Sequence, residues 1–75
     1  MQYDVVLDVK GLNCPLPLLR LKQLLSNVKS EEVIKMIATD PAVHLDVGVF
    51  IDKSKHQILF HERIDGIHYF YIKSA

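Results

Sequence analysis

The residue of this sequence best suited to chemistry is Cys14, its only cysteine. It lies in the segment Gly11-Leu12-Asn13-Cys14-Pro15-Leu16-Pro17, directly before a run of leucines typical of a helix. We therefore predict Cys14 at the N-cap and Pro15 at the first helical position, where its missing N–H removes nothing that the helix would use. The free N–H groups and the dipole of a helix start favour a thiolate, although Pro17 removes one further donor. The expected result is a pKa below the usual value of about 8.5 and a sulfur nucleophile.

A single cysteine is more often a small buried hydrophobic residue that does no chemistry. N-cap positions, however, are usually held by Ser, Thr, Asp or Asn, so the strand–turn–Cys-Pro-x-Pro–helix context favours a functional Cys14. A lone thiol excludes an intramolecular disulfide, which small secreted domains usually carry, and no signal peptide is visible. We therefore expect a cytoplasmic protein.

Composition limits the function classes. The chain has 75 residues, of which 49% are hydrophobic and 24% charged, so we expect one globular domain over residues 1–75. Nine basic and nine acidic residues leave a formal net charge of zero. This balance argues against direct nucleic-acid binding and against attachment to a membrane surface, and no apolar run is long enough to span a membrane.

Hydrophobic periodicity predicts the elements that must position Cys14. Alternating apolar residues predict strands, and an apolar stripe with helical spacing predicts a helix between the first two strands. The dipeptide Asp65-Gly66 favours a tight hairpin turn. The expected strands cover residues 3–9, 33–39, 57–63 and 67–73, and the stripe consists of Leu18, Leu21, Leu24, Leu25 and Val28.

A second helix follows the second strand. Asp40 and Pro41 are a helix start signal, so we predict Asp40 at the N-cap and Pro41 at the first helical position. Gly48 lies inside this helix and predicts a short or bent element.

The elements in this order close most simply as a two-layer α/β sandwich, βαβαββ, with two helices on one face of a four-stranded mixed sheet. The opposite face of the sheet is then open, and we expect Lys35, His61 and Tyr71 at its surface.

The four histidines, His44, His56, His61 and His68, do not match the paired ligand spacing of zinc sites. His61 and His68 can approach across the hairpin, but two ligands do not make a site. His56 is expected as a solvated residue in the turn before the third strand. We therefore predict no metal site.

The sequence resembles the TusA/SirA-like sulfur-carrier (sulfurtransferase) family over nearly its whole length. That resemblance implies the βαβαββ sandwich and a Cys14 that accepts sulfane sulfur as a transient persulfide and relays it to a partner protein, with no metal or organic cofactor. In the best-known members a cysteine desulfurase supplies the sulfur, which ends in tRNA thiolation, and other members are tied to sulfur oxidation, thiosulfate use or selenium metabolism. The matching positions are Asp8, Gly11, Leu12, Cys14, Pro15, Pro17, Asp40-Pro41-Ala42, Asp46-Val47, Phe50 and the closing strand to Lys73.

The sequence departs from the family pattern in three places. Gly48 stands where many members have proline, Val43 replaces a small hydroxyl residue, and no second cysteine lies near Ile51. A redox cycle with a resolving cysteine in the same chain is therefore excluded. The sulfur donor and acceptor, the pathway and the oligomeric state stay open at this point.

The first helix also suggests where partners bind. At 100° per residue, Leu16 and Leu19 lie nearly opposite the core stripe, and Arg20 and Lys22 flank that stripe. We predict an exposed apolar pair with basic neighbours that seats partner proteins around the thiol, although single exposed leucines are also ordinary. The alternative function is a redox-regulated protein-binding module, in which Cys14 is oxidised or glutathionylated as a signal.

Overall fold

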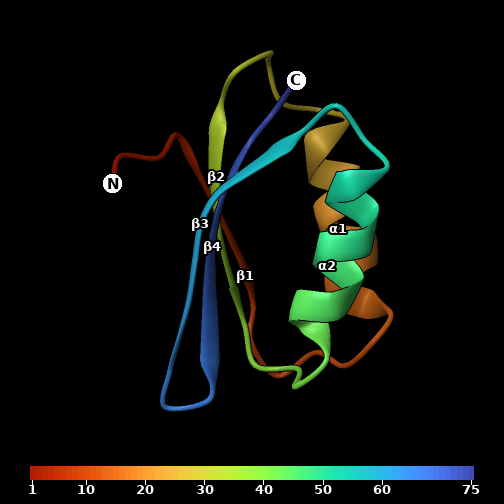
Figure 1. Cartoon of the computed structure of the whole chain (residues 1–75), viewed down its shortest axis with the longest axis vertical. Coiled ribbons are helices and arrows are strands. Elements are labelled where there is room, and N and C mark those ends of the chain that lie inside the picture. The colour runs from red at the N-terminus through yellow and green to blue at the C-terminus, as the bar shows by residue number, and fades with distance from the viewer.

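The four strands of the protein form one mixed sheet in the order β1-β2-β4-β3. β1 runs parallel to β2, and β4 is antiparallel to both of its neighbours. Figure 1 shows both helices on one face of this sheet, which is the predicted two-layer arrangement. The computed structural model describes all of residues 1–75, with β1 (Val5–Val9), α1 (Leu16–Leu25), β2 (Val33–Ala38), α2 (Val43–Asp52), β3 (Gln57–Ile64) and β4 (Ile67–Lys73).

The core lies between the sheet and the two helices. Alternate residues of β1, β2 and β4 face it. α1 contributes Leu21 and Leu25 of its predicted stripe, with Leu24 and Val28 partly buried, and α2 contributes Val43, Val47 and Ile51. α2 is a ten-residue helix that includes Gly48. Burial of this apolar surface is the main source of stability in so short a chain. The fully buried cluster consists of Val9, Leu21, Leu25, Ile34, Met36, Ala38, Val43, Val47, Ile51, Phe70 and Ile72.

The hairpin of β3 and β4 closes through the predicted turn. Asp65 and Gly66 have φ values of 51° and 79°, which is the left-handed conformation that a two-residue hairpin turn requires. A register shift between Ile58 and Phe60 changes the alternation of β3. His61 therefore pairs with Phe70 and faces the helices, so its predicted place on the open face is wrong.

The open face of the sheet carries an aromatic cluster around one lysine. Lys35 pairs with Tyr71 across β2 and β4, and both lie half-buried on this face, where they were predicted. The Lys35 Nζ atom lies 5.2 Å from the ring centroid of Tyr3, 5.8 Å from that of Tyr69 and 5.9 Å from that of Tyr71. Cation–π attraction of this kind holds the ammonium group against the sheet.

Candidate functional site

Two loops at one end of the molecule form the surroundings of Cys14. Because β1 and β2 are parallel, the loops that follow them leave from the same edge of the sheet, as Figure 1 shows. Gly11 takes a φ of 82°, so the turn uses the conformation that glycine allows. Its N–H donates to Thr39 Oγ1 at 2.9 Å, and the Cys14 N–H donates to Asp40 Oδ2 at 3.0 Å. These two bonds fix the Cys14 loop on its neighbour.

Helix α1 begins later than its sequence predicts. Its N-cap is Pro15, whose carbonyl accepts the Leu19 N–H at 3.0 Å, and Cys14 lies one residue before that cap. The Leu16 N–H instead donates to the Asn13 carbonyl at 2.9 Å, so Cys14 and Pro15 occupy the middle of a turn. The Cys14–Pro15 peptide bond is cis. The predicted N-cap position of Cys14 and helical position of Pro15 are therefore wrong.

Helix α2 also begins later than predicted, at Val43 with Ala42 as its N-cap. Asp40 is buried, with 7% of its surface exposed. Its Oδ2 accepts the Cys14 N–H and its Oδ1 accepts the Ala42 N–H at 3.3 Å, while its carbonyl accepts the Val43 N–H at 3.1 Å. Asp40 and Pro41 thus form a turn before the helix instead of capping it. The carboxylate therefore shares its two oxygens between the start of α2 and the Cys14 loop.

The thiol of Cys14 is exposed and lies among carboxylates. Its sulfur and one oxygen each of Asp40 and Asp46 all lie within 4.8 Å of one another. The pKa of the Cys14 thiol is raised above its usual value. The largest cause is a hydrogen bond to the Asp46 carboxylate, followed by desolvation and by the charges of Asp46 and Asp40. The predicted lowering of this pKa is wrong, because nearby negative charge disfavours the thiolate. This setting favours the protonated thiol over the thiolate.

Sequence reasoning did not assign a role to Asp46. It lies in the first turn of α2, beside the buried Val47 that anchors the helix to the core. Nothing in the local sequence spacing connects Asp46 with Cys14, because the two side chains meet only once α2 has packed beside the Cys14 loop. The only sequence signal was that Asp46 and Val47 match the family pattern.

The residues predicted to receive partners lie where helical geometry places them. Leu16 and Leu19 are 44% and 46% exposed, and Arg20 and Lys22 are exposed as well. Of the supporting motif residues, Leu12 packs against the core and Pro17 is buried. The exposed faces of α1 therefore carry an apolar pair with basic neighbours, in the chain segment that directly follows Cys14.

A shallow cavity of about 330 Å³ lies between α1 and α2. The Lys22 Nζ atom lies 5.2 Å from the ring centroid of Phe50, a residue that lines this cavity. Asp46 also lines it, so the cavity adjoins the thiol site. The complete lining consists of Leu18, Lys22, Asp46, Val49, Phe50 and Lys53.

Three of the four histidines gather where α2 meets the hairpin. His61 Nε2 and His68 Nδ1 are 2.9 Å apart, so these residues do approach each other as predicted. The His44 ring stacks on that of His68 with centroids 5.4 Å apart. Stacked rings present faces to one another and do not converge on a metal ion. His56 is half-buried and accepts the Ala75 N–H at 3.0 Å, so it is not simply solvated.

The thiol and the two carboxylates are the only group whose ligand atoms converge. Both oxygens of Asp40 already accept backbone N–H groups. Only Cys14 and Asp46 would then have ligand atoms available for a metal ion, and two ligands do not make a site. We assign no metal site to them.

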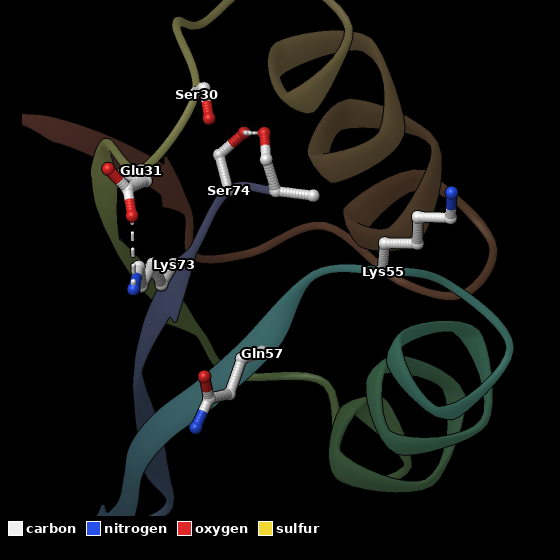
Figure 2. A pocket seen from close by; sticks show the side chains of 7 residues that line it. Ser30, Glu31, Lys55, Gln57, Lys73 and Ser74 are labelled. Carbon is white, nitrogen blue, oxygen red and sulfur yellow. Dashed lines mark hydrogen bonds and ion pairs between the residues drawn. The ribbon is translucent and has the colours of Figure 1, made fainter.

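A polar pocket of about 220 Å³ lies beside the C-terminus, at the end of the molecule opposite the thiol loops. Figure 2 shows the residues that line it. Glu31 and Lys73 form a salt bridge there at 3.7 Å, and the side chain of Lys55 lies apart from the other labelled residues. None of the lining residues is a thiol or a histidine. The pocket therefore offers no second thiol and no histidine base beside its serines, and Cys14 is the centre of the candidate site.

Comparison with known proteins shows the family of this chain. The sequence model of the family described as sulfurtransferase TusA matches residues 5–74. The chain belongs to the TusA family. It is 37% identical over 73 residues to the sulfur carrier protein TusA of Allochromatium vinosum, covering 97% of this chain and 96% of that protein. The TusA sulfur carrier of Pseudomonas putida strain GB-1 is 36% identical over 70 residues, with coverage of 93% and 88%.

The fold is shared with a solved structure as well. The SirA-like protein from Desulfitobacterium hafniense superposes with a TM-score of 0.83, at 18% identity, over 96% of this chain and 99% of that one. This likeness confirms the two-layer α/β sandwich. Membership of the TusA family supports a sulfur-carrier role and implies protein partners in sulfur transfer. Neither helix of the structure has the length and apolar character needed to cross a membrane.

Proposed function

We propose that the protein carries sulfane sulfur as a persulfide on Cys14 and relays it to a partner protein. The observation that carries this proposal is the exposed single thiol of Cys14, presented on a loop between two elements of a TusA-family fold. The motif residues around it support the loop: Gly11 allows its turn and Asp40 holds its backbone. An exposed sulfur on a fixed loop suits exchange between proteins.

The transfer step is a thiol–persulfide exchange. The Cys14 sulfur attacks the outer sulfur of the donor persulfide, a new S–S bond forms, and the S–S bond of the donor breaks. The donor cysteine leaves as a thiolate and takes up the proton that Cys14 releases. No net oxidation occurs, so the reaction needs neither a metal nor an organic cofactor.

Partners supply the remaining machinery. The donor in this proposal is a cysteine desulfurase or another sulfurtransferase, and the acceptor is a downstream protein of tRNA thiolation or of another sulfur-trafficking pathway. The chain itself acts on proteins and does not bind nucleic acid. A free single thiol suits the cytoplasm, where thiols are kept reduced.

The exposed pair Leu16 and Leu19 is the proposed docking surface for these partners, with Arg20 and Lys22 beside it. All four lie on α1, the helix that follows the Cys14 loop, so a protein seated there reaches the thiol. Apolar contacts provide affinity and basic side chains orient an acidic partner surface.

The proposed function is tested by intact mass measurement after incubation with a persulfide donor. Wild-type protein should gain the mass of one sulfur atom, the gain should disappear with reductant, and Cys14→Ser should gain nothing. If Cys14 is alkylated readily but never takes up sulfur, the carrier function is wrong and a redox-regulated binding module gains support. The family assignment does not favour that alternative.

A further inference from the structure

The negative charge beside Cys14 is not neutralised by any salt bridge within the chain. The two salt bridges of the protein join Lys10 to Asp8 and Lys73 to Glu31, and neither includes Asp40 or Asp46. Asp46 is half-buried and its carboxylate lies beside the Cys14 sulfur. A sulfur reagent that approaches the thiol therefore meets a fixed negative charge.

The basic side chains of the adjoining cavity do not pair with this carboxylate. Lys22 and Lys53 line the same cavity as Asp46, but neither forms a salt bridge with it, and the Lys22 Nζ atom lies against the Phe50 ring. Asp40, the second carboxylate at the site, is buried and directs both oxygens to backbone N–H groups. Asp46 is thus the carboxylate free to interact with an incoming molecule.

This arrangement creates a conflict within the proposed reaction. The thiolate is the reactive form of cysteine, yet the Asp46 carboxylate favours the protonated thiol. A positive charge brought next to Asp46 removes the conflict, because it pairs with the carboxylate and weakens its hold on the thiol proton. An incoming negative charge has the opposite effect and is also repelled.

We propose that Asp46 is a specificity-determining residue that admits to Cys14 those sulfur donors and acceptors whose reactive sulfur is accompanied by a cationic group. The fitting partner presents a lysine or arginine beside its own cysteine. This inference rests on the proposed function, and it adds to the docking surface on α1 a charge requirement at the thiol itself.

Small symmetrical disulfides of different charge test this inference directly. The probes are cystamine, which is cationic, bis(2-hydroxyethyl) disulfide, which is neutral, and 3,3′-dithiodipropionate, which is anionic. In each exchange the Cys14 sulfur forms a mixed disulfide, the probe S–S bond breaks, and the released thiolate takes up the proton lost by Cys14. Dividing each rate for wild-type protein by the rate for Asp46→Asn cancels the intrinsic reactivity of the probe.

We expect the ratio of the cystamine rate to the dithiodipropionate rate to be about five- to tenfold higher in wild type than in Asp46→Asn, and to shrink in concentrated salt. Alkylation by iodoacetamide should reach half its maximal rate at lower pH in Asp46→Asn. The matched control is Asp52→Asn, an exposed carboxylate at the other end of α2, which should leave both measurements unchanged.

An unchanged ratio in a folded Asp46→Asn protein would overturn the inference. If that variant does not fold, the salt dependence of the wild-type ratio decides: a preference that is absent, or that concentrated salt leaves unchanged, overturns it as well. The outcome is independent of the sulfur-uptake measurement. A charge preference without sulfur uptake would refute the carrier function alone, and uptake without the preference would refute only the role of Asp46.

Discussion

Replacing Asp40 with alanine should destabilise the protein through the loss of one bond between two loops. The carboxylate joins the Cys14 loop to the loop after β2 by accepting the Cys14 N–H at 3.0 Å, and its second bond, to Ala42, is local and longer at 3.3 Å. No other side chain of the structure accepts a hydrogen bond from the backbone of Cys14. The variant Asp40→Ala therefore removes a contact that connects residues far apart in the sequence.

The expected size of the effect follows from the burial and charge of this group. A hydrogen bond to a charged group contributes about 1.5–3 kcal/mol to stability. Removing a carboxylate that is only 7% exposed also removes its desolvation cost, and water can reach the exposed Cys14 loop, so we expect the lower part of that range, about 1.5–2 kcal/mol. A chain of 75 residues has roughly 4–11 kcal/mol in total. The loss is thus a substantial fraction of the stability.

Urea unfolding followed by circular dichroism measures this difference, and each kcal/mol lost should also lower Tm by about 4–8 °C. Asp8→Ala is the matched control, because Asp8 is exposed and both of its contacts are local: it accepts the Lys10 N–H at 3.1 Å and forms a surface salt bridge of 3.7 Å with the Lys10 side chain. That control should change the free energy of unfolding by at most about 0.5 kcal/mol. If Asp40→Ala is no less stable than Asp8→Ala, the bond between the loops does not stabilise the fold and the reasoning is refuted.

Three further outcomes are expected. Leu21→Ala should lower the free energy of unfolding by about 2–5 kcal/mol, because Leu21 is fully buried, whereas the exposed Leu19→Ala should change it by at most about 0.5 kcal/mol in the same urea titration. Leu16→Asp or Leu19→Asp should slow sulfur acceptance in the mass assay without changing the circular dichroism spectrum, and unchanged transfer would contradict the docking surface. Burial and the neighbouring histidines lower the pKa of His61 and His68, so the unfolded chain binds protons first as the pH falls below about 6.5. The free energy of unfolding should therefore decrease from about pH 7.5 to about pH 5, with a smaller decrease in His61→Gln, and an equal decrease in both proteins would contradict the assignment.

Most of the fold was predictable because each element carries its own periodic signal. The stripe that contains Leu21 and Leu25 is buried as predicted, and the Asp65-Gly66 turn closes the hairpin. Which side chains of β3 face the helices was not predictable from the sequence. A bulge between Ile58 and Phe60 adds a residue to this strand and reverses the alternation of its side chains after that point. His61 was therefore placed on the wrong side of the sheet.

The helix starts were mispredicted for a different physical reason. Asp40 is a good N-cap by residue type, but only its Oδ1 bonds locally, to the Ala42 N–H at 3.3 Å, while its Oδ2 accepts a backbone N–H from Cys14, 26 positions away. Capping signals describe a helix in isolation, whereas here the competing donor comes from a loop that only the folded sheet brings near. The same limit applies to the thiol, since Asp46 reaches Cys14 only after α2 has packed.

The exposure of Cys14 and the direction of its pKa shift together describe an accessible thiol whose reactive thiolate form is disfavoured in the free protein. Cys14 lies in a turn before the helix cap, and the hydrogen bond and negative charge of Asp46 beside its sulfur raise the pKa of the thiol. Oxidants and alkylating agents react with the thiolate, so a protonated thiol is protected between encounters. Under the role proposed for Asp46, a partner that neutralises this carboxylate favours the thiolate at the point where the donor or acceptor sulfur is already in place. The same carboxylate that raises the pKa of the Cys14 thiol would then restrict sulfur exchange to the docked complex.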